Sequence, residues 1–171
     1  MTARTVVHRL LSEALAEIRD GAANEATGVR RMAALFADLP PRLEDVARGD
    51  NTYHDVLAWL RGQAATSGLG EWLDTLIQQE TRGSGDPGAQ LHFLLYWIFI
   101  TIRYEAHEAS DWATFRLADL FHNVPLKLNS VLQGTWTYDE ILASLPEHAE
   151  RNGSAAWLDR ALPDATGVVA R

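Results

Sequence analysis

The sequence contains no cysteine and only one lysine, Lys127. Without cysteine, neither a disulfide framework nor a thiolate metal site is available, which is typical of a reducing compartment. Arginine supplies the remaining basic residues, and these are spread along the chain, with Arg30 and Arg31 as the one adjacent pair. A nucleic-acid backbone is bound by clustered basic side chains, so we expect no nucleic-acid partner.

Long apolar runs are scarce as well. The segment nearest to a membrane span is LHFLLYWIFITI, residues 91–102, which is well short of the roughly 20 residues that cross a bilayer. Near the start of the chain, Glu13 and Glu17 interrupt the apolar stretch that an export signal requires. We therefore expect a cytoplasmic protein with no membrane contact.

What the sequence does contain is typical of a globular domain. With 171 residues, 47% apolar and 22% charged, it has the size and composition of one folded unit. We expect a single helical domain over residues 1–163 and a loose C-terminal tail over 164–171. The net charge of −8 favours a basic partner over an acidic one.

Apolar residues recur at helical spacing along most of the chain, and no alternating pattern typical of strands is present. The prediction is an all-α protein, a compact bundle of about seven to nine helices around a central apolar helix at residues 89–108. Pro125 and Pro163 are expected to end helices, and Ser110 is expected to cap one.

The stretch RLADLFHNVP, residues 116–125, places polar side chains three and four residues apart on a helix that also needs an apolar side. The end of the preceding helix repeats this spacing. If the two helices form a hairpin, both polar stripes face one space, where Asp119 pairs with Arg116 or orients His122. The candidate binding residues are Arg103, Tyr104, His107, Glu108, Arg116, Asp119, His122 and Asn123. Such a cluster is either a structural hydrogen-bond network or a functional site, and the sequence leaves both open.

The same stretch resembles the LADRLHN-type segment of the alarmone hydrolases, which belong to the HD-domain phosphohydrolases. The resemblance implies that Asp119 is the last ligand of a divalent cation that activates water. His54 and Asp55, in the sequence YHD, would then supply the upstream ligands. The family has a further histidine shortly before this pair, whereas the only earlier histidine in this chain is His8.

The spacing from Arg116 to His122 is similar to the R-x4-6-H motif of the HEPN ribonucleases. This resemblance implies that Arg116 holds a phosphate and that His122 transfers a proton. If the protein is an enzyme, the candidate catalytic residues are therefore Arg116, Asp119 and His122.

Neither of these two resemblances supplies a complete set of catalytic residues, and the sequence has no cofactor motif. We therefore expect no cofactor and no catalysis. The leading hypothesis is a binding protein of the immunity, antitoxin or adaptor type, whose partner is another protein, possibly basic. An acidic surface for that partner is predicted from Glu13, Glu17, Asp20, Glu140, Glu147 and Glu150. The oligomeric state stays open.

Overall fold

The computed structural model describes residues 2–22, 27–80 and 85–165, and these ranges contain helices and connecting turns without a strand. The prediction of an all-α protein is confirmed. The helices are α1 (Ala3–Gly21), α2 (Thr27–Phe36), α3 (Leu39–Ala47), α4 (Tyr53–Thr66), α5 (Gly70–Glu80), α6 (Pro87–Glu108), α7 (Trp112–Phe121), α8 (Val124–Leu132), α9 (Tyr138–Asn152) and α10 (Ala155–Ala165).

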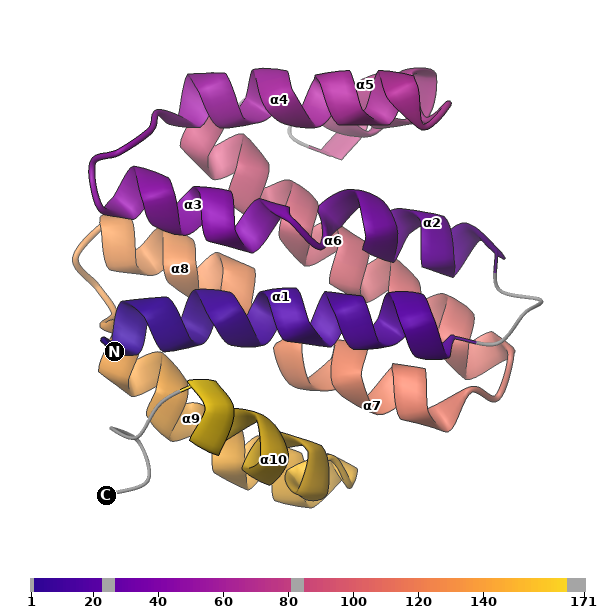
Figure 1. Ribbon diagram of the computed structural model, residues 1–171, viewed down its shortest axis with the longest axis vertical. Coiled ribbons are helices and arrows are strands. Elements are labelled where there is room, and N and C mark those ends of the chain that lie inside the picture. Colours follow the sequence, from indigo (N-terminus) through magenta and orange to yellow (C-terminus); the bar gives the residue numbers. More distant parts are fainter. Residues whose placement is uncertain (1, 23–26, 81–84, 166–171) are drawn as a thin grey trace.

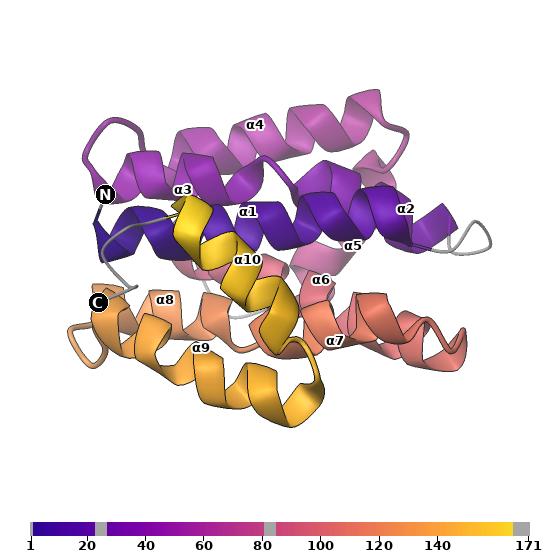
Figure 2. The same ribbon diagram turned by 60° about the horizontal axis from the view of Figure 1, so that its bottom comes forward.

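The helices pack around one continuous apolar core to which all of them contribute. Helices α2 and α3 follow each other along one side of α1, and α7, α9 and α10 contact its other side (Figure 1). Helix α10 crosses obliquely between α1 and α9, as Figure 2 shows. The C-terminal helices α9 and α10 therefore fold back onto the N-terminal helix α1. Helix α4 packs on α3, α5 and α6.

Helix α6 contains the apolar run seen in the sequence. It contacts α2, α4, α5, α7 and α8 and passes behind α1 in Figure 1. Its fully buried side chains are Leu91, Leu94, Leu95, Ile98, Phe99 and Ile102. Within the described residues, no helix is both long enough and apolar enough to cross a membrane.

Helix α7 ends before Pro125 as predicted, whereas the chain around Pro125 and Pro163 differs from prediction in two other ways. Pro125 begins a helix, α8, that the sequence did not predict, because proline in a first turn forgoes only an N–H that has no intrahelical partner. This brings the helices of the described residues to ten. Helix α10 also continues past Pro163 to Ala165. The remainder of the predicted tail, 166–171, lies outside the described residues.

The start of α7 differs from prediction by one residue. The cap is Asp111, whose carboxylate accepts from the backbone nitrogen of Thr114 at 3.3 Å and from its hydroxyl at 2.8 Å. Ser110, the predicted cap, has a φ of 55°, a left-handed conformation that helps reverse the chain. Helices α6 and α7 consequently form the expected hairpin.

Candidate functional site

Asp119, on α7, accepts hydrogen bonds from two other helices. Nε of Arg103, on α6, donates to Oδ1 at 2.7 Å. Nε2 of His148 and Nδ2 of Asn152, both on α9, donate to Oδ2 at 3.1 Å each. The Asp119 side chain is only 16% exposed, so these bonds replace most of its contact with water. We call Arg103, Asp119, His148 and Asn152 the Asp119 network; it links α6, α7 and α9.

The Asp119 network sets the charge of the carboxylate. Burial raises the pKa of Asp119, but hydrogen bonds from Arg103, Asn152 and His148 lower it, and the positive charge of Arg103 adds to them. The net result is a pKa below the ordinary value for aspartate. The carboxylate is therefore ionised near neutral pH, and both of its oxygens are engaged.

His122 lies beside this network. Its Nδ1 is 2.7 Å from the backbone oxygen of Asp119, and because a carbonyl only accepts, Nδ1 carries the proton. Burial lowers the pKa of His122, so the ring is neutral near pH 7 and its Nε2 is an acceptor. The nearby charges that act on it are those of Asp119, Arg103 and His148. His122 is thus the one predicted catalytic residue with a nitrogen available as a base.

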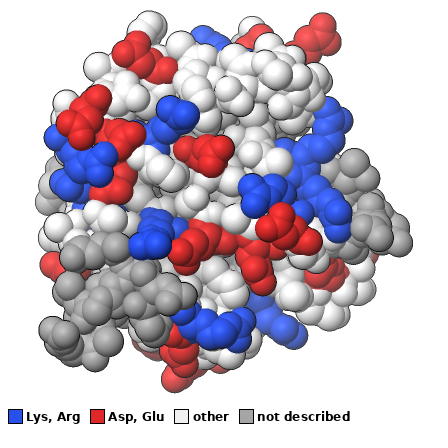
Figure 3. Space-filling model, in the orientation of Figure 1, with Lys and Arg blue, Asp and Glu red and all other residues white. Residues whose placement is uncertain are grey.

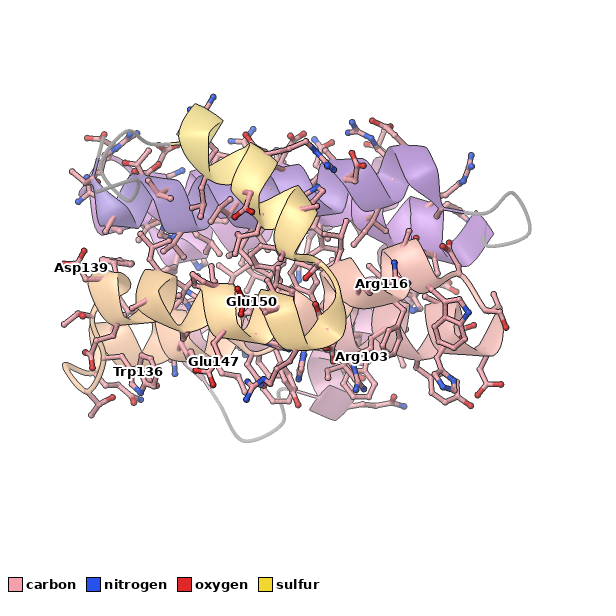
Figure 4. All side chains as sticks on the ribbon, turned by 90° about the horizontal axis from the view of Figure 1, so that it is seen from below. Arg103, Arg116, Trp136, Asp139, Glu147 and Glu150 are labelled. Atoms are coloured by element: carbon pink, nitrogen blue, oxygen red, sulfur yellow. The ribbon has the colours of Figure 1, made fainter. Side chains whose placement is uncertain are left out.

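Arg116 does not pair with Asp119, and that prediction is wrong. Its side chain lies against Gly153 at the turn between α9 and α10, while its backbone oxygen accepts from Nδ2 of Asn152 at 3.0 Å. Figure 4 shows Arg103 and Arg116 near the C-terminal end of α9, where the chain turns into α10. Arg103 fills the position beside Asp119 because it reaches across the α6–α7 hairpin.

Three other predicted residues lie outside the network. Tyr104 is 62% exposed, and Glu108 is exposed as well. Asn123 is exposed at the start of α8, where its side chain makes no capping bond. The eight residues expected to share one space are therefore divided between the network, the surface and the α9–α10 turn.

His107 belongs instead to a cluster of rings at the same hairpin, and Tyr104 lies near it on α6. His107 packs edge-on against Trp112 with ring centroids 5.4 Å apart, and Trp112 packs edge-on against Phe115 at 5.8 Å. Tyr104 precedes His107 by one helical turn. We call Tyr104, His107, Trp112 and Phe115 the aromatic patch. Trp112 is 45% exposed, an unusual exposure for so large an apolar ring.

The ligand set implied by the HD-domain resemblance is not assembled. His54 and Asp55 are exposed in the first turn of α4, and Asp55 donates its backbone N–H to the Thr52 hydroxyl at 3.1 Å. Among the described residues, no three His, Cys, Asp or Glu side chains lie close enough together to hold a metal ion. Asp119 has Arg103 and His148 as partners instead of His54 and Asp55.

His148 and Asn152 are the site residues that the sequence did not predict. They are four residues apart and therefore lie on one face of α9. This i, i+4 polar pair was the available signal, but the sequence does not show that it faces a carboxylate some thirty residues away.

Four of the six predicted acidic residues have a partner within the chain. Glu13 pairs with Arg9 at 3.3 Å, and Asp20 pairs with Arg19 at 3.0 Å. Glu140 bonds to Thr137 in a capping box, and Glu147 pairs with Arg151. On the face shown in Figure 3, acidic and basic side chains are interspersed. On this face, therefore, the acidic side chains are not separated from the basic ones.

Comparison of the chain with protein-family models, with curated proteins and with solved structures finds no match.

Proposed function

We propose that the protein acts by binding another protein, and that the aromatic patch is the contact surface. The observation that carries this proposal is the exposure of Tyr104 and Trp112, at 62% and 45%, at one end of a helical hairpin. Tyrosine, tryptophan and arginine are the residues most often responsible for binding energy at protein interfaces. Tyr104, Trp112 and the neighbouring Arg103 supply all three.

The Asp119 network supports this patch by fixing Arg103. The guanidinium of Arg103 lies over the ring of Phe115, 5.1 Å from its centroid, while its Nε is bonded to Asp119 at 2.7 Å. One arginine is thus held by the network on one side and by the patch on the other. A surface held in place before binding loses less conformational entropy when a partner docks.

The charges around the patch indicate the kind of partner. Glu105 and Glu108 are exposed on the same end of α6 as Tyr104, and the chain carries a net charge of −8. A lysine or arginine of a partner would pair with these carboxylates and lie over an aromatic ring. The partner proposed is therefore a protein with a basic side chain at the centre of its binding surface, which fits an immunity, antitoxin or adaptor role.

The test is capture of partners from the source cell by the wild-type protein and by a Tyr104→Ala/Trp112→Ala variant. A partner of this surface is retained by the wild type and lost by the variant. The matched control is Leu132→Ala, which removes an apolar side chain of similar exposure, 48%, from α8. Retention of every captured protein by the double variant would reject the patch as the binding surface.

A second candidate is metal-independent cleavage of RNA, favoured by the available Nε2 of His122 beside the charges of Arg103 and His148. In this reaction Nε2 accepts the proton of a ribose 2′-hydroxyl, whose oxygen attacks the adjacent phosphorus. The 5′-oxygen leaves and takes a proton from His148 in its protonated form. Cleavage in the presence of a chelator, lost in His122→Gln and kept in His107→Gln, would support this candidate over the binding proposal.

A further inference from the structure

We propose that the cavity between α1, α7 and α10 binds a small organic oxyanion, separately from the aromatic patch. The cavity has a volume of about 260 Å³. Arg116 from α7 and Arg160 from α10 both line it, together with Ser154 at the α9–α10 turn. Apolar walls come from Leu117 and Trp157.

Arg116 and Arg160 differ from the other arginines of the described ranges. Each of the others has a carboxylate, a backbone oxygen or an aromatic ring as its partner; these are Arg4, Arg9, Arg19, Arg30, Arg31, Arg42, Arg48, Arg61, Arg103 and Arg151. Among the described residues, the guanidinium groups of Arg116 and Arg160 have no such partner. Two unpaired guanidinium groups in one cavity are the donors that bind an oxyanion most specifically.

The local backbone adds further donors. Helix α10 begins at Ala155, and Ala156 and Trp157 of its first turn line the same cavity. N–H groups in a first helical turn have no intrahelical acceptor, and they carry the positive end of the helix dipole. They therefore favour the same negatively charged ligand as the two arginines.

Gly153 allows the chain reversal at this end of the cavity. Its φ of 87° reverses the chain between α9 and α10. A Cβ at this position would lie 3.4 Å from both Cδ and Nε of Arg116. Glycine is thus suited to the turn by its conformation, while the arginine side chain lies at contact distance from it.

The remaining walls narrow the class of ligand. Trp157 and Leu117 offer apolar surface, so an oxyanion attached to an aromatic or aliphatic group would use more of the cavity than a bare ion. Glu17 also lines the cavity, and its negative charge opposes the anion. The ligand class is therefore an organic phosphate monoester or carboxylate, and Glu17 weakens its binding.

The test is titration calorimetry at low ionic strength with three probes: phenyl phosphate, benzoate and inorganic phosphate. We expect saturable binding of an organic probe, with inorganic phosphate weaker. The organic probe that binds more tightly shows whether the site prefers a phosphate or a carboxylate. Absence of saturable binding by all three probes would overturn the proposal.

Variants locate the site. Arg116→Gln/Arg160→Gln should weaken the preferred probe by about tenfold or more, because bonds from two charged donors are lost. The control Arg48→Gln/Arg61→Gln changes the net charge equally at positions that do not line the cavity, and it should leave the affinity unchanged. Glu17→Gln should tighten binding. Equal weakening in both double variants would show a general charge effect and reject the site, whatever the fate of the aromatic patch.

Discussion

The two ends of α6 differ in whether the polar side chain they carry is charged. At the N-terminal end, His92 is 3% exposed, and its Nδ1 donates to the backbone oxygen of Gly88 at 2.7 Å. Burial lowers the pKa of His92 to about 4, so the ring is neutral. At the C-terminal end, Arg103 stays charged, partly exposed, and paired with Asp119.

The difference teaches where this fold can support a charge. A buried imidazole avoids the free-energy cost of a buried charge by losing its proton. A guanidinium does not lose its proton, so it needs contact with water or with a carboxylate. His8, on α1, behaves as His92 does: it is buried, its Nδ1 bonds to the oxygen of Arg4, and burial lowers its pKa. Charge is thus kept at the hairpin end of α6, next to the aromatic patch.

The largest effect on the free energy of unfolding is expected in the apolar middle of α6, between its two ends. Phe99 is fully buried and packs on Phe121 with ring centroids 6.3 Å apart. Phe99→Ala should lower the free energy of unfolding by about 4 kcal/mol, measured by urea denaturation. Phe93→Ala, at a partly exposed position of the same helix, should cost clearly less. Equal losses would show that burial does not distinguish these two faces of α6.

The second largest effect on the free energy of unfolding is expected from acid, which acts on His92 at the N-terminal end of α6. The pKa of His92 is about 4 in the folded protein, against an ordinary value of 6.5, so between these values the unfolded chain binds the proton and the folded chain does not. The contribution of neutral His92 to the free energy of unfolding is therefore fully present above pH 6.5. About 3 kcal/mol of the free energy of unfolding is lost as the pH falls to 4.

The measurement is urea denaturation across that pH range. His92→Gln should remove this part of the pH dependence, because glutamine does not titrate there. His54→Gln, at an exposed position, should keep it. An unchanged slope in His92→Gln would assign the acid sensitivity to another group.

The charged end should show a smaller, pairwise effect. Arg103 is 40% exposed, so solvent screens its interaction with Asp119. A double-mutant cycle on Arg103→Gln and Asp119→Asn should give a coupling of about 1 kcal/mol. The cycle on Arg116→Gln and Asp119→Asn should be additive, since those side chains do not pair. Coupling in the second cycle and not in the first would contradict the geometry of the network.

The smallest effect on stability is expected at the aromatic patch. Trp112→Ala should change the free energy of unfolding by less than about 0.5 kcal/mol, because much of the ring is already in water. The same change should abolish partner binding. A loss of several kcal/mol would instead make Trp112 a structural anchor, and its exposure would then no longer support a docking role.

The helices and the core were predictable because helical periodicity records which side of each helix is buried. The apolar face of α6 is the clearest case. The helix that begins at Val124 was missed because proline is compatible with a helix start as well as with a helix end, and local sequence does not distinguish the two. Ser110 and Asp111 are both good caps, and the backbone path selects between them.

The candidate site was predictable only in part. Spacing on one helix identified Asp119 and His122 as neighbours, and the hairpin brought in Arg103. It could not identify His148 and Asn152, because contacts between distant helices depend on how α9 docks. Spacing also favoured Arg116 as the partner of Asp119, whereas the fold directs that arginine towards the turn that follows α9.

Asn152 and Gly153 also form a potential site of slow, spontaneous deamidation. An asparagine followed by glycine is prone to deamidation: the backbone nitrogen of the glycine attacks the side-chain carbonyl carbon, ammonia leaves, and water opens the resulting succinimide to a carboxylate. In the fold, Gly153 donates that N–H to the oxygen of Ala149 at 3.0 Å. The Asn152 amide is itself held, with Nδ2 on Asp119 at 3.1 Å and Oδ1 on the backbone nitrogen of Ser154 at 3.0 Å. Ageing at this position therefore requires the C-terminal end of α9 to open, and its product would place a second carboxylate against Asp119.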